Sequence, residues 1–235
     1  MRVEIWSDVV CPWCYIGKRR FEKALASFDH SDEIEVVWRS FQLHPEHPKG
    51  LREPLEESLA AKIGGTVDQV RAMNDHVKTL AAAEGLNYDF ERYTLVNTSD
   101  AHRLTHLARA HELGAELHER FLRAQLIEGE VLDDADTLVR LSAEVGVPED
   151  DARRVLEGGD YTADVDEEIR ELGALGGSGV PFFVIDRRYG VSGAQPTEVF
   201  LRALETARAD EAQRSGSTPY SGARKYRSIC VSLRA

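Results

Sequence analysis

The chain has few cysteines and no long apolar run, and both features limit the kinds of protein that it can be. Only 3 of its 235 residues are cysteine, and two of these share one short motif, so a disulfide framework is excluded. No stretch is apolar for long enough to span a bilayer. The first residues enter a strand pattern directly, without the basic and apolar regions of a secretory signal. We therefore expect a globular protein that stays in the cytoplasm.

Positive charge is also scarce. The chain has 29 Lys and Arg residues against 41 Asp and Glu residues, a net charge of −12. A protein with this much negative charge repels polyanions, so neither nucleic acid nor a membrane is expected as a partner. The basic residues within 224–234 are the exception, and they follow a Gly/Ser/Pro-rich stretch at 215–222. We interpret residues 211–235 as a polar, flexible tail without an assigned function, and Cys230 within it as an inert free thiol.

The most informative motif is Cys11-Pro12-Trp13-Cys14. It follows an alternating strand pattern at 2–6 and opens an amphipathic helix. Proline is tolerated at the first helical position, so Cys11 is the predicted N-cap and Cys14 the third helical residue. A sulfur at the N-cap faces unpaired N–H groups and the positive end of the helix dipole, which favour the thiolate. We predict that Cys11 is the nucleophile and that the deeper Cys14 resolves mixed disulfides.

Two other interpretations of this motif are weaker. A structural zinc ion needs four ligands, but the chain has no second C-x-x-C pair. A metal would therefore have to recruit residues such as His102 and His106 from a distant helix, and we expect no metal. A purely structural disulfide between Cys11 and Cys14 would close a very short loop and stabilise little.

The order of the predicted elements indicates an α/β fold. The first strand and helix are followed by a second strand at 34–43, which makes a βαβ unit. Residues 54–175 are helical in period almost throughout, with six or seven helices. Strand character returns at 180–186, followed by a hairpin and a last helix at 196–208. This order predicts a thioredoxin fold interrupted by a large, all-helical insertion domain. We place the first part of the thioredoxin-like domain at 1–50, the insertion at 51–175 and the second part at 176–210.

Pro181 stands at the head of a strand that reads as central. Proline cannot donate to a sheet ladder, and a cis bond would place the Val180 backbone beside the dithiol, where it could pair with an extended peptide. From the residues alone, a trans proline at the start of a strand is the simpler interpretation. The match to the interrupted thioredoxin fold favours the cis form.

Four segments of the chain resemble a known family. They are 7–17 around the dithiol, 97–104 (Asn-Thr-Ser-Asp-Ala-His-Arg-Leu), 179–183 (Gly-Val-Pro-Phe-Phe) and 192–195 (Ser-Gly-Ala-Gln). Together they are similar to the FrnE branch of the DsbA-like oxidoreductases, and the resemblance covers about residues 2–208. It implies a cis proline facing the dithiol, and exchange of thiols and disulfides with proteins or small molecules. It makes Cys11 and Cys14 the catalytic pair, with Pro12, Trp13, Val180, Pro181, His102 and Gln195 as candidate substrate-binding residues.

The function predicted from the sequence is thiol–disulfide oxidoreductase, with no cofactor besides the redox-active disulfide. Related 2-hydroxychromene-2-carboxylate isomerases and kappa-class glutathione transferases have serine where Cys11 stands and use glutathione. A glutathione-dependent isomerase or transferase is therefore the alternative, and glutathione remains open as a co-substrate. A second alternative is a binding protein or chaperone that uses the helical insert. The expected partners are thiols and disulfides, and the sequence leaves a homodimer open.

Overall fold

The computed structural model describes residues 1–215 and 227–228. Cys230 and most of the basic tail lie outside the described residues. The strands are β1 (Arg2–Ser7), β2 (Glu35–Ser40), β3 (Glu53–Pro54), β4 (Thr94–Leu95), β5 (Phe182–Ile185), β6 (Tyr189–Ser192) and β7 (Arg227–Ser228). The α-helices are α1 (Pro12–Ala26), α2 (Leu55–Ile63), α3 (Val67–Ala83), α4 (Ser99–Ala110), α5 (Gly114–Arg123), α6 (Ala135–Glu144), α7 (Glu149–Glu157), α8 (Thr162–Ala174) and α9 (Thr197–Ser215).

The central sheet has the strand order β2-β1-β5-β6-β7. Strands β1 and β2 are parallel and joined through α1, which confirms the predicted βαβ unit. Strand β5 runs antiparallel to β1 and pairs Phe183 with Ile5, and β6 continues as an antiparallel hairpin. The α/β fold class is therefore confirmed. The second strand is shorter than predicted, because pairing with β1 ends at Ser40.

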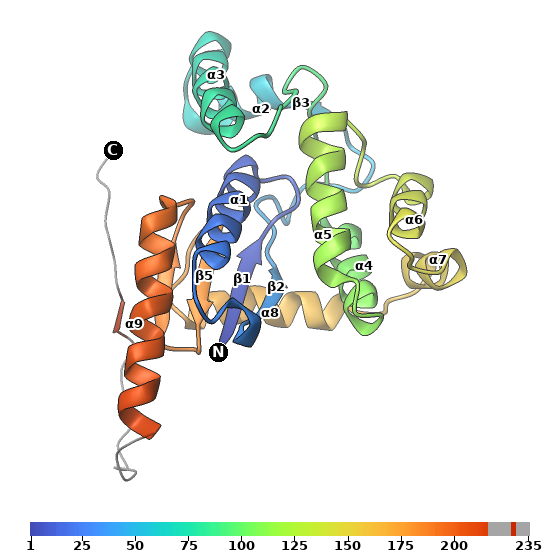
Figure 1. Cartoon of the computed structure of the whole chain (residues 1–235). Coiled ribbons are helices and arrows are strands. Elements are labelled where there is room, and N and C mark those ends of the chain that lie inside the picture. The colour runs from blue at the N-terminus through green and yellow to red at the C-terminus, as the bar shows by residue number, and fades with distance from the viewer. Residues whose placement is uncertain (216–226, 229–235) are drawn as a thin grey trace.

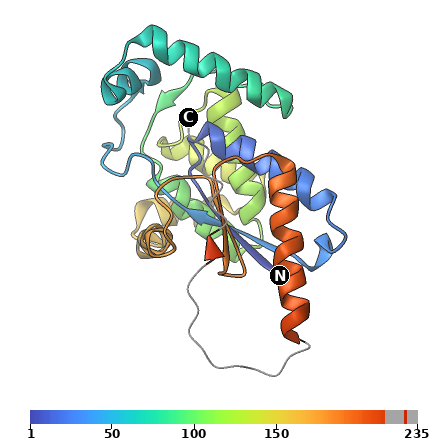
Figure 2. The same cartoon turned by 90° about the vertical axis from the view of Figure 1, so that its left-hand side faces the viewer.

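Helices cover both faces of the sheet (Figures 1 and 2). On one face, α1 and α9 pack against alternate strand residues, with Phe21 and Phe200 each close to Phe183. On the other face, Trp6 packs against Leu172 of α8. Side chains of β1 therefore alternate between two faces, with Val3 and Ile5 in the apolar layer under α1 and α9, and Trp6 on the α8 side.

The segment between β2 and β5 is mainly helical, with one exception. Strands β3 and β4 form a two-stranded antiparallel sheet, which the sequence analysis missed because each strand has only two residues. Helix α3 begins after Thr66, which forms a capping box with Gln69. Within the described residues, no helix is both long and apolar enough to cross a membrane. The division into residues 1–50, 51–175 and 176–210 stays a prediction.

The insert and the dithiol share one apolar core. Cys11 and Cys14 belong to the same buried cluster as Leu104 of α4 and Phe121 of α5. The first turn of α1 is thus embedded in the insert, whereas its later turns face the sheet and α9. The surroundings of the sulfur atoms are therefore set largely by residues that lie about 100 positions away in the sequence.

Candidate active site

The dithiol lies where β1 ends and α1 begins. Cys11 is the N-cap of α1 and Pro12 occupies its first turn, as predicted from the sequence. Both cysteines are free thiols, with 3% of Cys11 and none of Cys14 exposed. The Cys11 side chain makes no capping hydrogen bond to the first turn, contrary to our expectation. Its sulfur points instead toward Val180, two residues before strand β5.

That strand supplies the second wall of the site. The Val180–Pro181 peptide bond is cis, and the Cys11 thiol donates weakly to the Val180 carbonyl at 3.8 Å. Helix α1 approaches closely here because Gly17 has no side chain. A Cβ atom on Gly17 would lie 3.0 Å from Cγ of Pro181 and 3.5 Å from Ala194. The Pro181 carbonyl accepts a hydrogen bond from Gly193, which ties the turn before α9 to the same wall.

Cys14 is the more protected thiol. Burial raises its pKa well above the ordinary value, and the neighbouring Cys11 sulfur raises it further. The Ser7 hydroxyl and the Asp8 backbone N–H act in the opposite direction, because both donate hydrogen bonds to the Cys14 sulfur. Cys14 is therefore a neutral thiol at pH 7. It becomes a thiolate only when a base takes its proton or a hydrogen-bond donor stabilises the negative charge.

A buried histidine completes this arrangement. His118 lies 3.0 Å from the Ser7 hydroxyl through its Nε2 atom and stacks on Trp38 with ring centroids 4.2 Å apart. Burial holds the pKa of His118 well below its usual range, and the charges of His102 and Lys18 act in the same direction. The imidazole is therefore neutral, and it is linked to the Cys14 sulfur through one hydroxyl group.

His102, which the family resemblance made a candidate substrate-binding residue, is buried in the structure. It is 2% exposed, and its Nε2 atom lies 3.2 Å from the Asp8 carboxylate. Asp8 also accepts a hydrogen bond from the backbone N–H of Leu43. The histidine is therefore a buried partner of a loop carboxylate that is itself fully buried. No group of three or more metal-ligating side chains occurs within the described part of the chain.

The remaining predicted site residues surround the cysteines in different ways. Trp13 is 38% exposed and is the most accessible member of the motif. The Pro12 carbonyl is occupied by a hydrogen bond from Tyr88. Gln195 donates to the Ser192 carbonyl on the turn before α9 and contacts neither sulfur in the described structure. Trp13, Val180 and Pro181 are thus the predicted binding residues best placed near Cys11.

Two tyrosines of the insert hold the active-site loop, and the sequence analysis missed both. Tyr93 donates to the Val10 carbonyl and Tyr88 to the Pro12 carbonyl, each at 2.7 Å. Burial raises the pKa of both phenols, so they stay protonated and can donate. These bonds lie on either side of Cys11. No local motif marks them, because the contacts span 76 and 83 residues.

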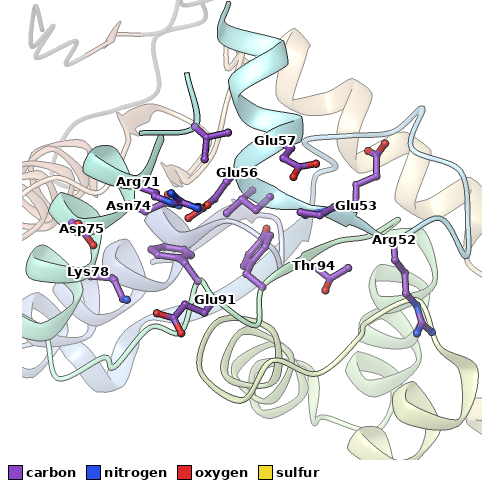
Figure 3. Close-up of a pocket in the computed structure, with 15 residues that line it drawn as sticks. Arg52, Glu53, Glu56, Glu57, Arg71, Asn74, Asp75, Lys78, Glu91 and Thr94 are labelled. Carbon is purple, nitrogen blue, oxygen red and sulfur yellow. Dashed lines mark hydrogen bonds and ion pairs between the residues drawn. The ribbon is translucent and has the colours of Figure 1, made fainter. Parts of the chain in front are cut away.

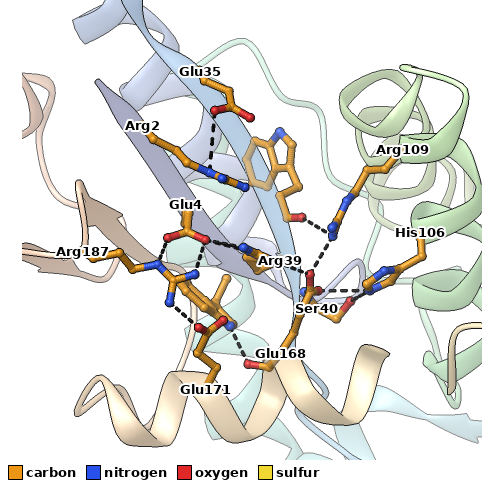
Figure 4. Close-up of polar contacts among 12 residues, drawn as sticks. Arg2, Glu4, Glu35, Arg39, Ser40, His106, Arg109, Glu168, Glu171 and Arg187 are labelled. Carbon is orange, nitrogen blue, oxygen red and sulfur yellow. Dashed lines mark hydrogen bonds and ion pairs between the residues drawn. The ribbon is translucent and has the colours of Figure 1, made fainter. Parts of the chain in front are cut away.

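A second polar cluster lies on the α8 side of the sheet (Figure 4). Its centre is Glu168, which accepts hydrogen bonds from Arg39, Arg109 and the backbone of Ser40, with His106 at 3.1 Å. Burial alone would raise the pKa of Glu168, but these partners outweigh burial and lower it. His106 therefore belongs to this ion-pair cluster and not to a pair with His102.

Comparison with known proteins agrees with this geometry. A model of the DsbA-like thioredoxin domain matches residues 2–205. The chain belongs to the DsbA-like thioredoxin family. It is 44% identical to a probable DsbA oxidoreductase, SCO1869, from Streptomyces coelicolor, with a TM-score of 0.87 over 95% of this chain and 94% of that chain.

Two more distant solved structures share the fold. One is a 2-hydroxychromene-2-carboxylate isomerase, 16% identical, with a TM-score of 0.65 over 93% of this chain and 100% of that chain. The other is the cytosolic disulfide reductase DsbM from Pseudomonas aeruginosa with GSH, 19% identical, with a TM-score of 0.59 over 92% of this chain and 100% of that chain. These likenesses confirm a DsbA-like thioredoxin fold with a helical insert.

Proposed function

We propose that this protein is a thiol–disulfide oxidoreductase that exchanges disulfides with protein or small-molecule thiols through Cys11 and Cys14. The observation that carries the proposal is the unequal placement of the two thiols. Cys11 faces the Val180 carbonyl at the cis-proline wall, whereas Cys14 is fully buried behind it. A nucleophile must meet substrate and a resolving thiol must not, so this placement divides the two roles.

The proposed reaction balances as two thiol exchanges. In the oxidised enzyme a substrate thiolate attacks the Cys11 sulfur, and Cys14 leaves and takes up a proton. A second substrate thiolate then attacks the substrate sulfur of the mixed disulfide. Cys11 leaves, so the substrate disulfide forms and the enzyme dithiol is restored. In the reverse direction Cys11 attacks a substrate disulfide, and Cys14 displaces the reduced product.

The cis-proline wall supports binding of an extended chain. The Val180 backbone lies beside Cys11 and continues into β5, so a substrate strand could pair with it. Trp13 provides an exposed aromatic surface next to the same sulfur. We assign these residues and Pro181 to substrate binding, with no cofactor besides the disulfide.

Glutathione is included as a candidate small-molecule substrate. The turn formed by Gly193, Ala194 and Gln195 precedes α9, and a helix N-terminus favours carboxylates. The fold shared with DsbM, which was solved with GSH and is described as cytosolic, supports testing glutathione and a cytoplasmic location. The buried Cys14 disfavours the isomerase alternative, since isomerisation has no use for a resolving thiol.

The test is the equilibrium of the dithiol in glutathione buffers, followed by thiol trapping and mass spectrometry. We expect a reversible two-electron transition, with a glutathione adduct on Cys11 in the Cys14→Ser variant. Cys11→Ser should abolish exchange, and retained turnover in that variant would refute the assignment. Thiols that never pair, together with tight non-covalent glutathione binding, would support the isomerase or transferase alternative. Activity that persists in the double serine variant would support the binding-protein alternative.

A further inference from the structure

A cavity of about 750 Å³ opens within the insert, away from the sulfur atoms (Figure 3). Helices α2 and α3, the β3–β4 pair and the loop that follows α3 form its walls. Its volume falls in the range of ligand sites in proteins, which is roughly 300–1,000 Å³. No part of the redox mechanism above uses it.

A buried amide faces this cavity without a partner. Asn74 of α3 lines the cavity and is 8% exposed, and its Nδ2 atom has no hydrogen-bond partner in the described structure. Buried polar groups are nearly always paired, so an orphaned amide points to a missing ligand. A side-chain amide carries a donor and an acceptor together, which is the arrangement that pairs with a peptide group.

The rest of the cavity favours a cationic ligand. Phe90 and Tyr93 give it a buried aromatic floor. The lining contains five carboxylate side chains and three basic ones. Among the described residues, the side chains of Glu57, Asp75 and Glu91 make no hydrogen bond or ion pair, and neither do those of Arg52 and Lys78, so the unpaired charge of the lining is negative by one. Free carboxylates next to aromatic rings suit lysine or arginine side chains, whose ammonium or guanidinium groups can use both.

The cavity is connected to the active-site loop through its floor. Tyr93 lines the cavity and donates to the carbonyl of Val10, which precedes Cys11. Phe90 packs edge-on against Tyr88, with ring centroids 5.7 Å apart, and Tyr88 bonds to the loop just beyond Cys11. A chain bound in the cavity would therefore lie against the residues that position the nucleophile.

We propose that this cavity binds an extended, cationic peptide segment, with Asn74 pairing to a peptide group and the free carboxylates receiving Lys or Arg side chains. The role of the cavity as a subsite for protein substrates rests on the proposed redox function. In that role the cavity selects proteins that have basic residues near their reactive cysteine. Binding of the segment itself does not depend on the dithiol.

The first experiment measures binding of a cysteine-free peptide by calorimetry. The probe is an end-blocked pentapeptide, Ala-Lys-Tyr-Lys-Ala, and its control replaces both lysines with glutamate. We expect the lysine peptide to bind at least about 10-fold more tightly, and its affinity to fall as salt is raised. Asn74→Leu should weaken binding by about 3- to 10-fold. Equal affinities for the two peptides would overturn the proposal.

Asn74→Leu changes a buried residue and could disturb folding, so two variants at exposed residues are tested as well. Asp75→Asn changes an exposed residue of the rim and should weaken binding by about 2- to 3-fold at low salt. Glu205→Gln removes an exposed carboxylate on α9, outside the cavity, and should leave binding unchanged. Equal effects of Asp75→Asn and Glu205→Gln would mean that only net charge matters, and would overturn the site.

A kinetic measurement separates failure of the subsite from failure of the redox function. Cysteine-containing versions of the two peptides are supplied as mixed disulfides with glutathione. A lower KM for the lysine version, with similar kcat, supports both proposals. Binding without any exchange would overturn the redox function and leave the site standing. Exchange with the same KM for both peptides would overturn the subsite and leave the redox function standing.

Discussion

Replacing Gly17 with alanine tests the close approach of α1 to the cis-proline wall. The new Cβ atom would lie 3.0 Å from Cγ of Pro181, closer than an ordinary van der Waals contact, and 3.5 Å from Ala194. Alanine gains about 0.5–1 kcal/mol over glycine inside a helix, whereas overpacking costs about 1–3 kcal/mol. The two effects leave a net loss of about 1 kcal/mol in the free energy of unfolding, within a range from near zero to ~2.5 kcal/mol.

The chain provides a matched control in Gly173→Ala. Gly173 lies in α8, and a Cβ atom there would have no neighbour within 4 Å. That variant should gain about 0.5–1 kcal/mol, because only the helix preference changes. Urea unfolding measures both. If Gly17→Ala is stabilised as much as Gly173→Ala, the proposed contact with Pro181 is wrong. Disulfide exchange should also slow in Gly17→Ala alone, since its Cβ pushes on the wall that faces Cys11.

Three further predictions concern the buried polar groups. Ser7→Ala removes a donor to the Cys14 sulfur, so the pKa of Cys14 should rise further and the mixed disulfide in single-turnover assays should persist several-fold longer. Glu168→Gln should cost about 3–5 kcal/mol at pH 7, measured by urea unfolding, because the half-buried guanidinium groups of Arg39 and Arg109 lose their buried charged partner. Since the pKa of Glu168 is lowered in the fold, its stabilisation is complete above pH ~4.3 and is lost as the pH falls further, so the variant should show a flatter acid limb. Tyr93→Phe should cost about 1–3 kcal/mol in the same assay, since the buried Val10 carbonyl loses its donor.

The parts of the site that are local in sequence could be predicted. Pro12 at the start of an amphipathic run places the N-cap at Cys11, and the structure has the helix beginning there. The alternating residues of β1 and the β-branched run at 34–43 predicted two parallel strands, and these pair as expected. Such signals need only a few neighbouring residues, because helix capping and strand alternation are short-range effects.

The parts that depend on tertiary contacts could not be predicted. His118 meets Ser7 across 111 residues, and nothing in the surrounding sequence distinguishes it from a surface histidine. His102 lies in a recognisable segment, but nothing in the sequence links it to Asp8, which is 94 residues away. The packing of α4 and α5 against the active-site loop brings both histidines to their partners. The hydrophobic pattern of a sequence shows which face of a helix is buried, but not which other element that face meets.

The insert therefore acts as the second half of the active site and not as a separate lid. Its tyrosines hold the carbonyls on either side of Cys11, and His118 lies behind the hydroxyl that bonds to Cys14. All of these groups are buried and uncharged, so they fix the loop without offering a charge to either sulfur. The pKa of Cys14 is consequently governed by desolvation and by the other sulfur, and only weakly opposed by Ser7. In the proposed mechanism the insert would set the lifetime of a mixed disulfide on Cys11, because the residues that bury Cys14 decide how readily its thiol loses a proton.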